Sequence, residues 1–261
     1  MGGVGAFHRE TSTFFPFFST DLMKRNFLLL IAMMFVLGSV LSAQEATIKK
    51  PFNGLNLDGW QLKAGNRENC WIAGTFEPNA TTIVAQPVRG GEKGVLVNAV
   101  SADWRETRKG VDIFTAEKFG DCTVKIEFLI VKGGNSGVYL MGEYEVQIAD
   151  SFGKADDRLG QGDCGAIYSA ARPSTNAATE PGTWQKFEIE FVAPKFDAHG
   201  NKIAFGLFKK ITLNGKVIQE NVEVRGPTGG GLTMKEAATG PLMLQGDHGV
   251  VAFRNIEIIV P

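Results

Sequence analysis

The sequence contains few cysteines and no pattern of them that would bind a metal or cross-link a small domain. Its three cysteines, Cys70, Cys122 and Cys164, lack the paired spacing of a zinc site. An odd number leaves at least one free thiol or one intermolecular bridge. Because free cysteine behaves as a small apolar side chain, buried structural thiols are favoured over a catalytic cysteine.

Neither sign of charge is in excess. The chain has 27 basic and 28 acidic residues, a formal net charge of -1, and no run rich in Lys and Arg. Nucleic acid or an anionic membrane surface as a partner therefore has no electrostatic basis. With 44% hydrophobic and 21% charged residues, the composition is that of an ordinary soluble globular protein. Small neutral ligands fit it best.

The longest apolar run is too short to span a bilayer, which needs ~20 residues. Residues 23–43 contain, in order, a basic start, this apolar centre and a small-residue cleavage site, the three parts of a secretory signal peptide. We predict cleavage after Ala43 and a periplasmic or secreted protein, with a transmembrane anchor as the alternative. Residues 1–22 precede the better start at Met23 and are interpreted as a mis-assigned extension. The predicted cleavage site contains no cysteine, so a lipid-anchored form is not expected.

Residues 44–261 carry the patterns of β-strands. Apolar and polar residues alternate over residues 121–131 and 185–192, and residues 144–149 form a third such segment. Asn214-Gly215 between apolar flanks predicts a two-residue hairpin turn. No amphipathic helical segment of comparable quality is present. Many short strands with 32 glycines overall predict an all-β fold, a single jelly-roll sandwich of two antiparallel sheets.

A glycine-rich segment at residues 227–232 resembles a phosphate-binding loop only in composition. It contains three consecutive glycines but lacks the strand-to-helix context that such a loop needs. We interpret it as a flexible loop and predict no nucleotide site.

Four stretches of the mature chain, in the same order, carry a family pattern. They are residues 52–60, residues 133–140 running into 144–150, residues 176–184, and residues 244–249 with 253–256. Together they resemble the 3-keto-disaccharide hydrolase family, also described as 3-keto-glucoside lyase and hydratase domains. The resemblance implies a concanavalin A-like jelly roll, similar to legume lectins and laminarinases, with a sugar-binding face on one curved sheet. The stretches 150–164 and 195–209 depart from the pattern, which affects loop-level specificity.

The predicted strand at residues 144–149 places two polar side chains on one face. Glu145 and Gln147 lie about 7 Å apart on the face opposite the side chains that enter the core. Asn135 then lies near the end of a neighbouring strand. A solvated outer face is the alternative explanation of this pattern.

One of the two histidines of the mature chain stands out. His199 lies in a turn-like context, whereas His248 follows Asp247 directly before the final strand. Imidazole titrates near neutral pH, so His248 could act as a base, an acid or a metal ligand. A purely structural histidine is the alternative.

The tryptophans Trp60, Trp71, Trp104 and Trp184 are mainly core candidates. An exposed indole can also stack on the apolar face of a sugar, and Trp184 is the candidate for that role.

The resemblance implies an enzyme that cleaves a glycoside already oxidised to a ketone at carbon 3. The ketone acidifies the proton on carbon 2, so a base can remove it and the enolate can expel the substituent at carbon 1. His248 is the candidate base and Glu145 the candidate acid or metal ligand. Candidate substrate-binding groups are Asn135, Gln147, Asp150, Trp184, Gln245 and Asp247. A divalent metal could stabilise the enolate, although no ligand spacing requires one.

Two other functions were weighed. A laminarinase-like glycosidase needs two carboxylates ~5 to 5.5 Å apart, but Gln147 replaces the middle carboxylate, and Asp150 lies on the other face of the strand unless a bulge intervenes. A non-catalytic sugar-binding module would use the same face without any base, and the sequence does not distinguish it from the enzyme.

Overall fold

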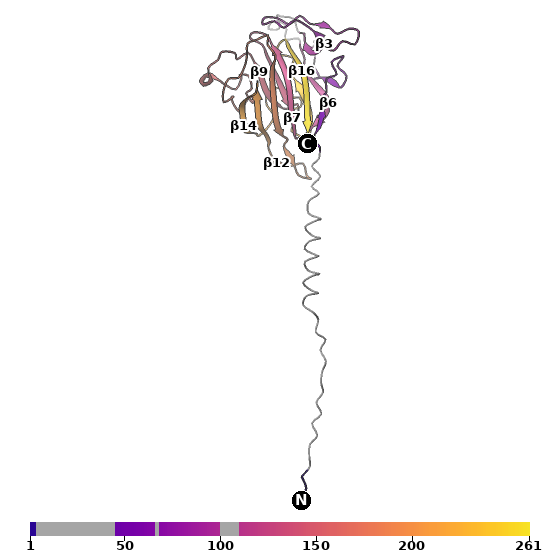
Figure 1. Cartoon of the computed structure of the whole chain (residues 1–261), viewed down its shortest axis with the longest axis vertical. Coiled ribbons are helices and arrows are strands. Elements are labelled where there is room, and N and C mark those ends of the chain that lie inside the picture. Colours follow the sequence, from indigo (N-terminus) through magenta and orange to yellow (C-terminus); the bar gives the residue numbers. More distant parts are fainter. Residues whose placement is uncertain (4–44, 66–67, 100–109) are drawn as a thin grey trace. The chain divides into compact units, whose positions relative to one another are not determined.

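The strands predicted from the sequence form two large antiparallel sheets (Figure 1). The computed structural model describes residues 1–3, 45–65, 68–99 and 110–261. The predicted leader, apart from its first three residues, and Trp104 lie outside this part. Residues 45–261 form one compact unit. The two sheets share one buried cluster, so the predicted all-β sandwich of two antiparallel sheets is confirmed.

The larger sheet has nine strands, with the C-terminal strand β16 near its centre. Its order is β14-β13-β10-β7-β16-β5-β3-β4, and β1 also pairs with β16. The strands are β1 Thr47–Lys49, β3 Trp71–Thr75, β4 Gln86–Pro87, β5 Val95–Asn98, β7 Cys122–Ile130, β10 Gln185–Val192, β13 Gly206–Leu213, β14 Lys216–Val224 and β16 Val251–Val260.

The smaller sheet has five strands in the order β2-β6-β15-β8-β9. They are β2 Trp60–Leu62, β6 Ile113–Phe119, β15 Gly240–Leu244, β8 Asn135–Leu140 and β9 Tyr144–Ala149. A two-stranded sheet of β11 Lys195–Phe196 and β12 Lys202–Ala204, and a 3₁₀ helix, η1 Asp156–Arg158, lie in the two stretches that depart from the family pattern.

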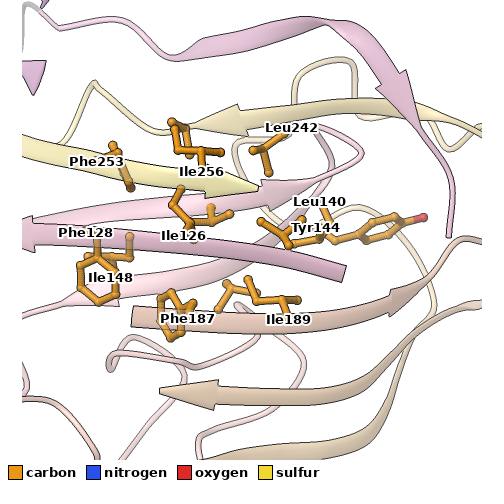
Figure 2. Packing of buried hydrophobic residues seen from close by; sticks show 14 of the residues in the cluster. Ile126, Phe128, Leu140, Tyr144, Ile148, Phe187, Ile189, Leu242, Phe253 and Ile256 are labelled. Carbon is orange, nitrogen blue, oxygen red and sulfur yellow. The ribbon is translucent and has the colours of Figure 1, made fainter. Parts of the chain in front are cut away.

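The core lies between the two large sheets because alternate side chains of each strand point inward. In β7, Ile126 and Phe128 have no exposed surface, and the Phe128 ring stacks on Phe187 of β10 at 4.9 Å. Tyr144 and Ile148 enter the same cluster from β9 of the smaller sheet (Figure 2). Burying each such side chain stabilises the fold by roughly 1.5–3 kcal/mol. The inward-facing apolar side chains therefore favour packing of the two sheets against each other.

The predicted hairpin turn connects β13 to β14. Asn214 and Gly215 have φ of 53° and 82°, and Leu213 pairs with Lys216 across the turn. Two positive φ values are characteristic of the turn type that matches the twist of the flanking strands.

Two of the three thiols lie in the interior, as predicted. Cys122 and Cys164 are buried, and burial raises the pKa of each to about 12. Cys70 is half-buried and packs against a second hydrophobic cluster on the outer face of the larger sheet. Within the part of the chain described above, no helix is long and apolar enough to cross a membrane.

Candidate active site

A cavity of ≈ 310 Å³ lies on the face of the five-stranded sheet that points away from the core. It brings together residues that are far apart in the sequence. Its lining consists of Lys63, Asp112, Asn135, Tyr139, Glu145, Gln147, Tyr168, Gly229, Gly230, Gln245, Asp247 and His248. Six of the eight residues predicted from the sequence therefore share one pocket, and Asp150 and Trp184 do not. The six are Asn135, Glu145, Gln147, Gln245, Asp247 and His248.

Strands β8 and β9 position the first group of polar side chains. Tyr139 pairs with Glu145 and Gly137 with Gln147 in the antiparallel register, so their side chains share one face. The Gln147 amide donates a hydrogen bond to Asn135 Oδ1 at 3.2 Å. This arrangement matches the placement predicted from the alternation of β9, although both Glu145 and Gln147 are buried rather than solvated.

The side chain of Glu145 lies across β8 because residue 137 is glycine. A Cβ atom at Gly137 would lie 2.3 Å from Glu145 Oε1, a distance that no real contact allows. The glycine thus creates the space in which the carboxyl group turns over its neighbouring strand.

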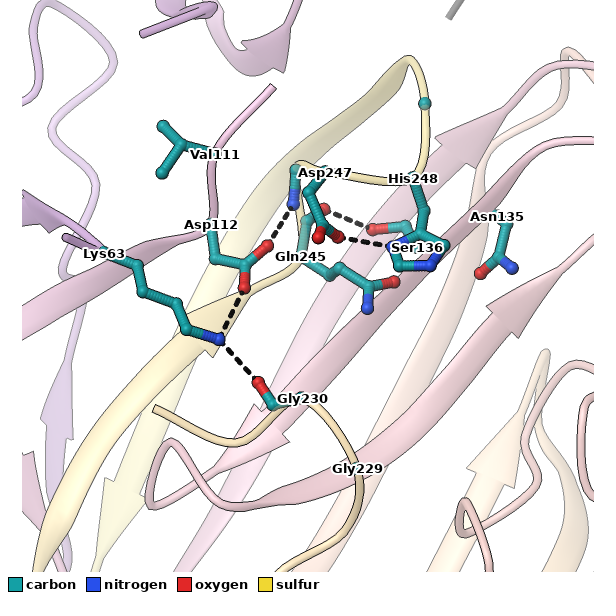
Figure 3. Close-up of polar contacts among 12 residues, drawn as sticks. Lys63, Val111, Asp112, Asn135, Ser136, Gly229, Gly230, Gln245, Asp247 and His248 are labelled. Atoms are coloured by element: carbon teal, nitrogen blue, oxygen red, sulfur yellow. Dashed lines mark hydrogen bonds and ion pairs between the residues drawn. The ribbon is translucent and has the colours of Figure 1, made fainter. Parts of the chain in front are cut away.

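The loop between β15 and β16 presents Asp247 and His248. Asn98, at the end of β5 in the opposite sheet, donates hydrogen bonds to the carbonyls of Gly246 at 2.6 Å and Gly249 at 2.7 Å. The Gly246 amide in turn donates to Asp112 Oδ1 at 3.0 Å (Figure 3). Both ends of the loop are therefore fixed by buried groups.

His248 is held by its neighbour Asp247, whose carboxylate is hydrogen-bonded to the ring Nδ1 (Figure 3). This hydrogen bond raises the pKa of His248, and the negative charges of Asp247, Glu145 and Asp112 raise it further against the opposing effect of burial. The pairing fixes the ring and directs Nε2 as the nitrogen that can exchange a proton with a ligand.

The protonation of Glu145 is controlled by its burial. Desolvation raises its pKa to about 7, with further raising by Asp112 and Asp247, while a hydrogen bond with Tyr139 and the charge of His248 lower it. A carboxyl group with this pKa holds a proton for part of the time at neutral pH, as a general acid must.

Tyr139 links Glu145 to the floor of the pocket. Its hydroxyl donates to the Gly229 carbonyl at 3.1 Å and accepts from Gln245 Nε2 at 3.3 Å. Burial and the charge of Glu145 raise the pKa of Tyr139 far above its usual range, so the hydroxyl stays protonated. Gln245 Oε1 is buried without a hydrogen-bond partner among the described residues. An unsatisfied buried acceptor suits the hydroxyl group of a ligand.

Lys63 and Asp112 complete the pocket, and no sequence motif indicates either residue. Lys63 Nζ lies 3.1 Å from Asp112 Oδ2 and donates to the Gly230 carbonyl at 2.7 Å. Lys63 follows β2 and Asp112 precedes β6, so only the pairing of these strands brings them together. The ammonium group of Lys63 can stabilise negative charge on a bound ligand.

The whole sandwich, including this pocket, matches a known family. Residues 47–259 fit the family described as 3-keto-alpha-glucoside-1,2-lyase-like domains. The chain belongs to this family. Membership identifies it as a carbohydrate-acting enzyme, as the sequence motifs had suggested.

Solved structures of the same type come from Parabacteroides distasonis. One protein, described as a "putative glycosyl hydrolase", shares 28% identity over 82% of this chain and 83% of its own, with a TM-score of 0.58. A second with the same description shares 18% identity over 81% of this chain and 92% of its own, with a TM-score of 0.50. The second likeness concerns the fold alone. No curated protein sequence gave a match.

Two residues nominated from the sequence lie outside the pocket of this family member. Trp184 packs against Phe76, with ring centroids 6.2 Å apart, and the Arg254 guanidinium lies 4.1 Å above its ring. Asp150 accepts a hydrogen bond from the Gly133 amide at 2.8 Å and fixes the turn before β8. Neither side chain lines the cavity, so the structure does not bring these two predicted substrate-binding residues together with the others.

Tyr168, and not Trp184, is an aromatic side chain that lines the pocket and could stack on a sugar. Its side chain lines the pocket and is 39% exposed, so one ring face is open to a ligand. The sequence offers no pattern that singles it out, because it lies in the irregular segment after β9, where its amide donates to the Glu145 carbonyl at 3.1 Å.

The residues of the pocket do not form a metal site. Within the described ranges, no three His, Cys, Asp or Glu side chains are grouped so as to hold an ion. Asp112 is used by Lys63 and the Gly246 amide, and Asp247 by His248. This donor set does not fit the divalent metal that the sequence left open.

Proposed function

We propose that this protein cleaves 3-keto-glycosides by removing the proton on carbon 2 and eliminating the substituent at carbon 1. The observation that carries the proposal is the juxtaposition, in one pocket, of His248 held by Asp247 and the buried carboxyl group of Glu145. A base and a protonated carboxyl group in one pocket are what such an elimination requires. The ligand is a small carbohydrate.

The first step is proton abstraction. His248 Nε2 takes the proton from carbon 2, and the C–H electron pair forms the C2–C3 double bond of an enolate, with negative charge on the carbon 3 oxygen. The ammonium group of Lys63 is the pocket group that stabilises this charge. Because Asp247 occupies Nδ1, the resulting imidazolium is stabilised by an adjacent carboxylate.

The second step expels the leaving group. The enolate re-forms the ketone, the electron pair moves to the C1–C2 bond, and the C1–O bond breaks while Glu145 donates its proton to the departing oxygen. The product is an unsaturated keto sugar. Water then adds across the C1–C2 double bond: Glu145 takes a proton from the water that attacks carbon 1, and His248 returns its proton to carbon 2. Both side chains regain their starting protonation.

The side chains that remain orient the sugar. Asn135 and Gln147 are hydrogen-bonded to each other, and Gln245 Oε1 has no hydrogen-bond partner among the described residues. These three amides can therefore bind ring hydroxyls. The face of Tyr168 can pack against the ring.

His248→Ala tests the proposal with a 3-keto glucoside of p-nitrophenol, whose cleavage releases a coloured aglycone. We expect ~10²- to 10⁴-fold lower kcat/KM, the usual effect of losing a general base, with an unchanged melting temperature. The matched control is His199→Ala, because His199 lies in an exposed turn. The wild type should leave the unoxidised glucoside intact, since its carbon 2 proton is not acidic.

Two outcomes would contradict the assignment. Near wild-type activity of His248→Ala would remove His248 as the base and leave Glu145 in that role. Absence of cleavage by the wild type on all keto-glycosides, combined with measurable sugar binding, would favour a non-catalytic sugar-binding module.

A further inference from the structure

A second cavity lies on the same face of the five-stranded sheet as the active-site pocket. Its volume is ≈ 420 Å³, and Gln61, Phe114, Met141 and Pro241 are among its lining residues. Two of its carboxylates, Glu143 and Glu236, are already engaged by protein donors, so it lacks the chemical groups of the first pocket.

The two cavities are consecutive sections of one groove. Residues two apart on a strand point to the same face about 7 Å apart. Gln61 on β2 lines the second cavity, and Lys63, two residues further along, lines the first. In the same way Phe114 on β6 lines the second cavity, and Asp112, two residues before it, lines the first. The sheet would therefore offer a continuous groove if nothing crossed it.

Residues 228–234, called the strap from here on, cross the groove between the cavities. Tyr139 donates a hydrogen bond to the Gly229 carbonyl at 3.1 Å. Lys63 donates to the Gly230 carbonyl at 2.7 Å, a contact shown in Figure 3. These two side chains come from β8 and from the end of β2, on either side of β6 and β15 in the sheet. The strap thus lies over the middle of the sheet.

Burial of Met243 on β15 supports this position. Met243 pairs with Phe114 on one side and Tyr139 on the other, and it has no exposed surface. It belongs to neither hydrophobic cluster of the core, because its side chain points to the groove face. A segment that lies over the middle of the sheet accounts for this burial.

Both ends of the strap are fixed at the turn between β8 and β9. The Glu143 carbonyl accepts a hydrogen bond from the Thr228 amide at 2.8 Å, and the Glu143 side chain holds Thr233 and Met234. This buried carboxylate accepts hydrogen bonds from the Thr233 amide at 2.8 Å, the Thr233 hydroxyl at 2.6 Å and the Met234 amide at 3.0 Å. The backbone passes so close that a Cβ atom at Gly231 would lie 2.4 Å from Glu143 Oε2. The consecutive glycines therefore allow a close crossing, whereas their composition alone had indicated only a flexible loop.

We propose that the strap determines substrate length by closing the groove on one side of the active-site pocket, so that only a terminal sugar ring can enter. A ring bound in the pocket can carry a substituent on its open side but not toward the second cavity. This inference rests on the proposed function for the identity of the reacting ring. Glu143 is the positioning residue that holds the strap in place.

The experiment compares two substrates and two variants. The substrates are a disaccharide with its keto group on the terminal ring and a tetrasaccharide with its keto group on an internal ring. We expect the wild type to favour the disaccharide by about a hundredfold in kcat/KM, the discrimination that a steric barrier supplies. Glu143→Ala, which removes the three hydrogen bonds that hold Thr233 and Met234, should loosen this part of the strap and reduce the preference at least about tenfold. Glu236→Gln is the control, because Glu236 lines the second cavity without contacting the strap backbone in any hydrogen bond described here.

Binding provides a second measurement that needs no turnover. Calorimetric titration with glucose, cellobiose and cellohexaose should show an affinity that stops rising at two rings in the wild type and continues to rise in Glu143→Ala. Failure of the proposed function would leave this binding pattern intact. Gly231→Ala, which pushes the strap away from Glu143, replaces Glu143→Ala if the latter does not fold. The proposal is overturned if Glu143→Ala and Gly231→Ala show the same kcat/KM preference and the same binding affinities as the wild type. It is also overturned if the wild type cleaves and binds substrates of both lengths equally well.

Discussion

At the scale of single residues, the site depends on a carboxyl group whose protonation is set by its surroundings. Glu145 is 3% exposed, and its raised pKa comes mainly from lost hydration. Glutamate in an unfolded chain titrates near 4.3. The folded protein therefore binds the proton more tightly than the unfolded chain does, which couples the chemistry of the site to stability.

Glu145→Gln should be more stable than the wild type in alkaline solution. A group whose pKa is raised by folding contributes its stability below the unfolded pKa and loses it as pH rises through the folded pKa, here from ~4.3 to about 7. The neutral amide avoids that loss. Urea unfolding at pH 5 and pH 8 should show a gain for the variant at pH 8 that is small or absent at pH 5. The same gain at both pH values would mean that the carboxyl group is not the cause.

At the scale of structural elements, the loop between β15 and β16 is positioned from the opposite sheet. Asn98 has no exposed surface and donates to two carbonyls about 150 residues away in the chain, with separations of 148 and 151. Because these carbonyls flank Asp247 and His248, the amide of Asn98 fixes the orientation of the proposed base.

Asn98→Asp replaces the donor amide by a carboxylate that repels both carbonyls. We expect kcat/KM on a keto-glycoside to fall at least about tenfold, because small misplacements of a catalytic group are costly. The acidic limb of the pH profile should shift as the Asp247–His248 pairing loosens. Asn201→Asp, in an exposed turn, is the control. A variant with lower stability but an unchanged pH profile would show that Asn98 supports only the fold.

The elements themselves could largely be predicted from the sequence, whereas their joint site could be predicted only in part. Alternation identified β7, β9 and β10 because each buries one face, and it correctly placed Glu145 and Gln147 together. Lys63, Tyr139 and Tyr168 were missed because pairing of distant strands and an irregular segment bring them to the pocket. Trp184 lies away from the other predicted residues, because it packs on a separate cluster on the outer face of the larger sheet, which alternation does not reveal.

At the scale of the whole molecule, we propose that the protein is exported and begins near Gln44 after removal of its leader. The support is the order of basic, apolar and small residues over 23–43. N-terminal sequencing of protein recovered from the periplasm or medium of the producing bacterium should start at or near Gln44. Retention of Lys24 or Phe27 in that material would contradict the proposal.

The two hydrogen bonds that Asn98 donates to the β15–β16 loop make the active site dependent on packing of the two sheets. Asn98 belongs to one sheet and Glu145 to the other, so the acid and the base face each other only when the sheets are packed together. An unfolded chain in transit across a membrane would therefore carry every catalytic side chain and remain inert. Loss of activity during denaturation should accordingly coincide with cooperative separation of the sheets, with no active partly unfolded form.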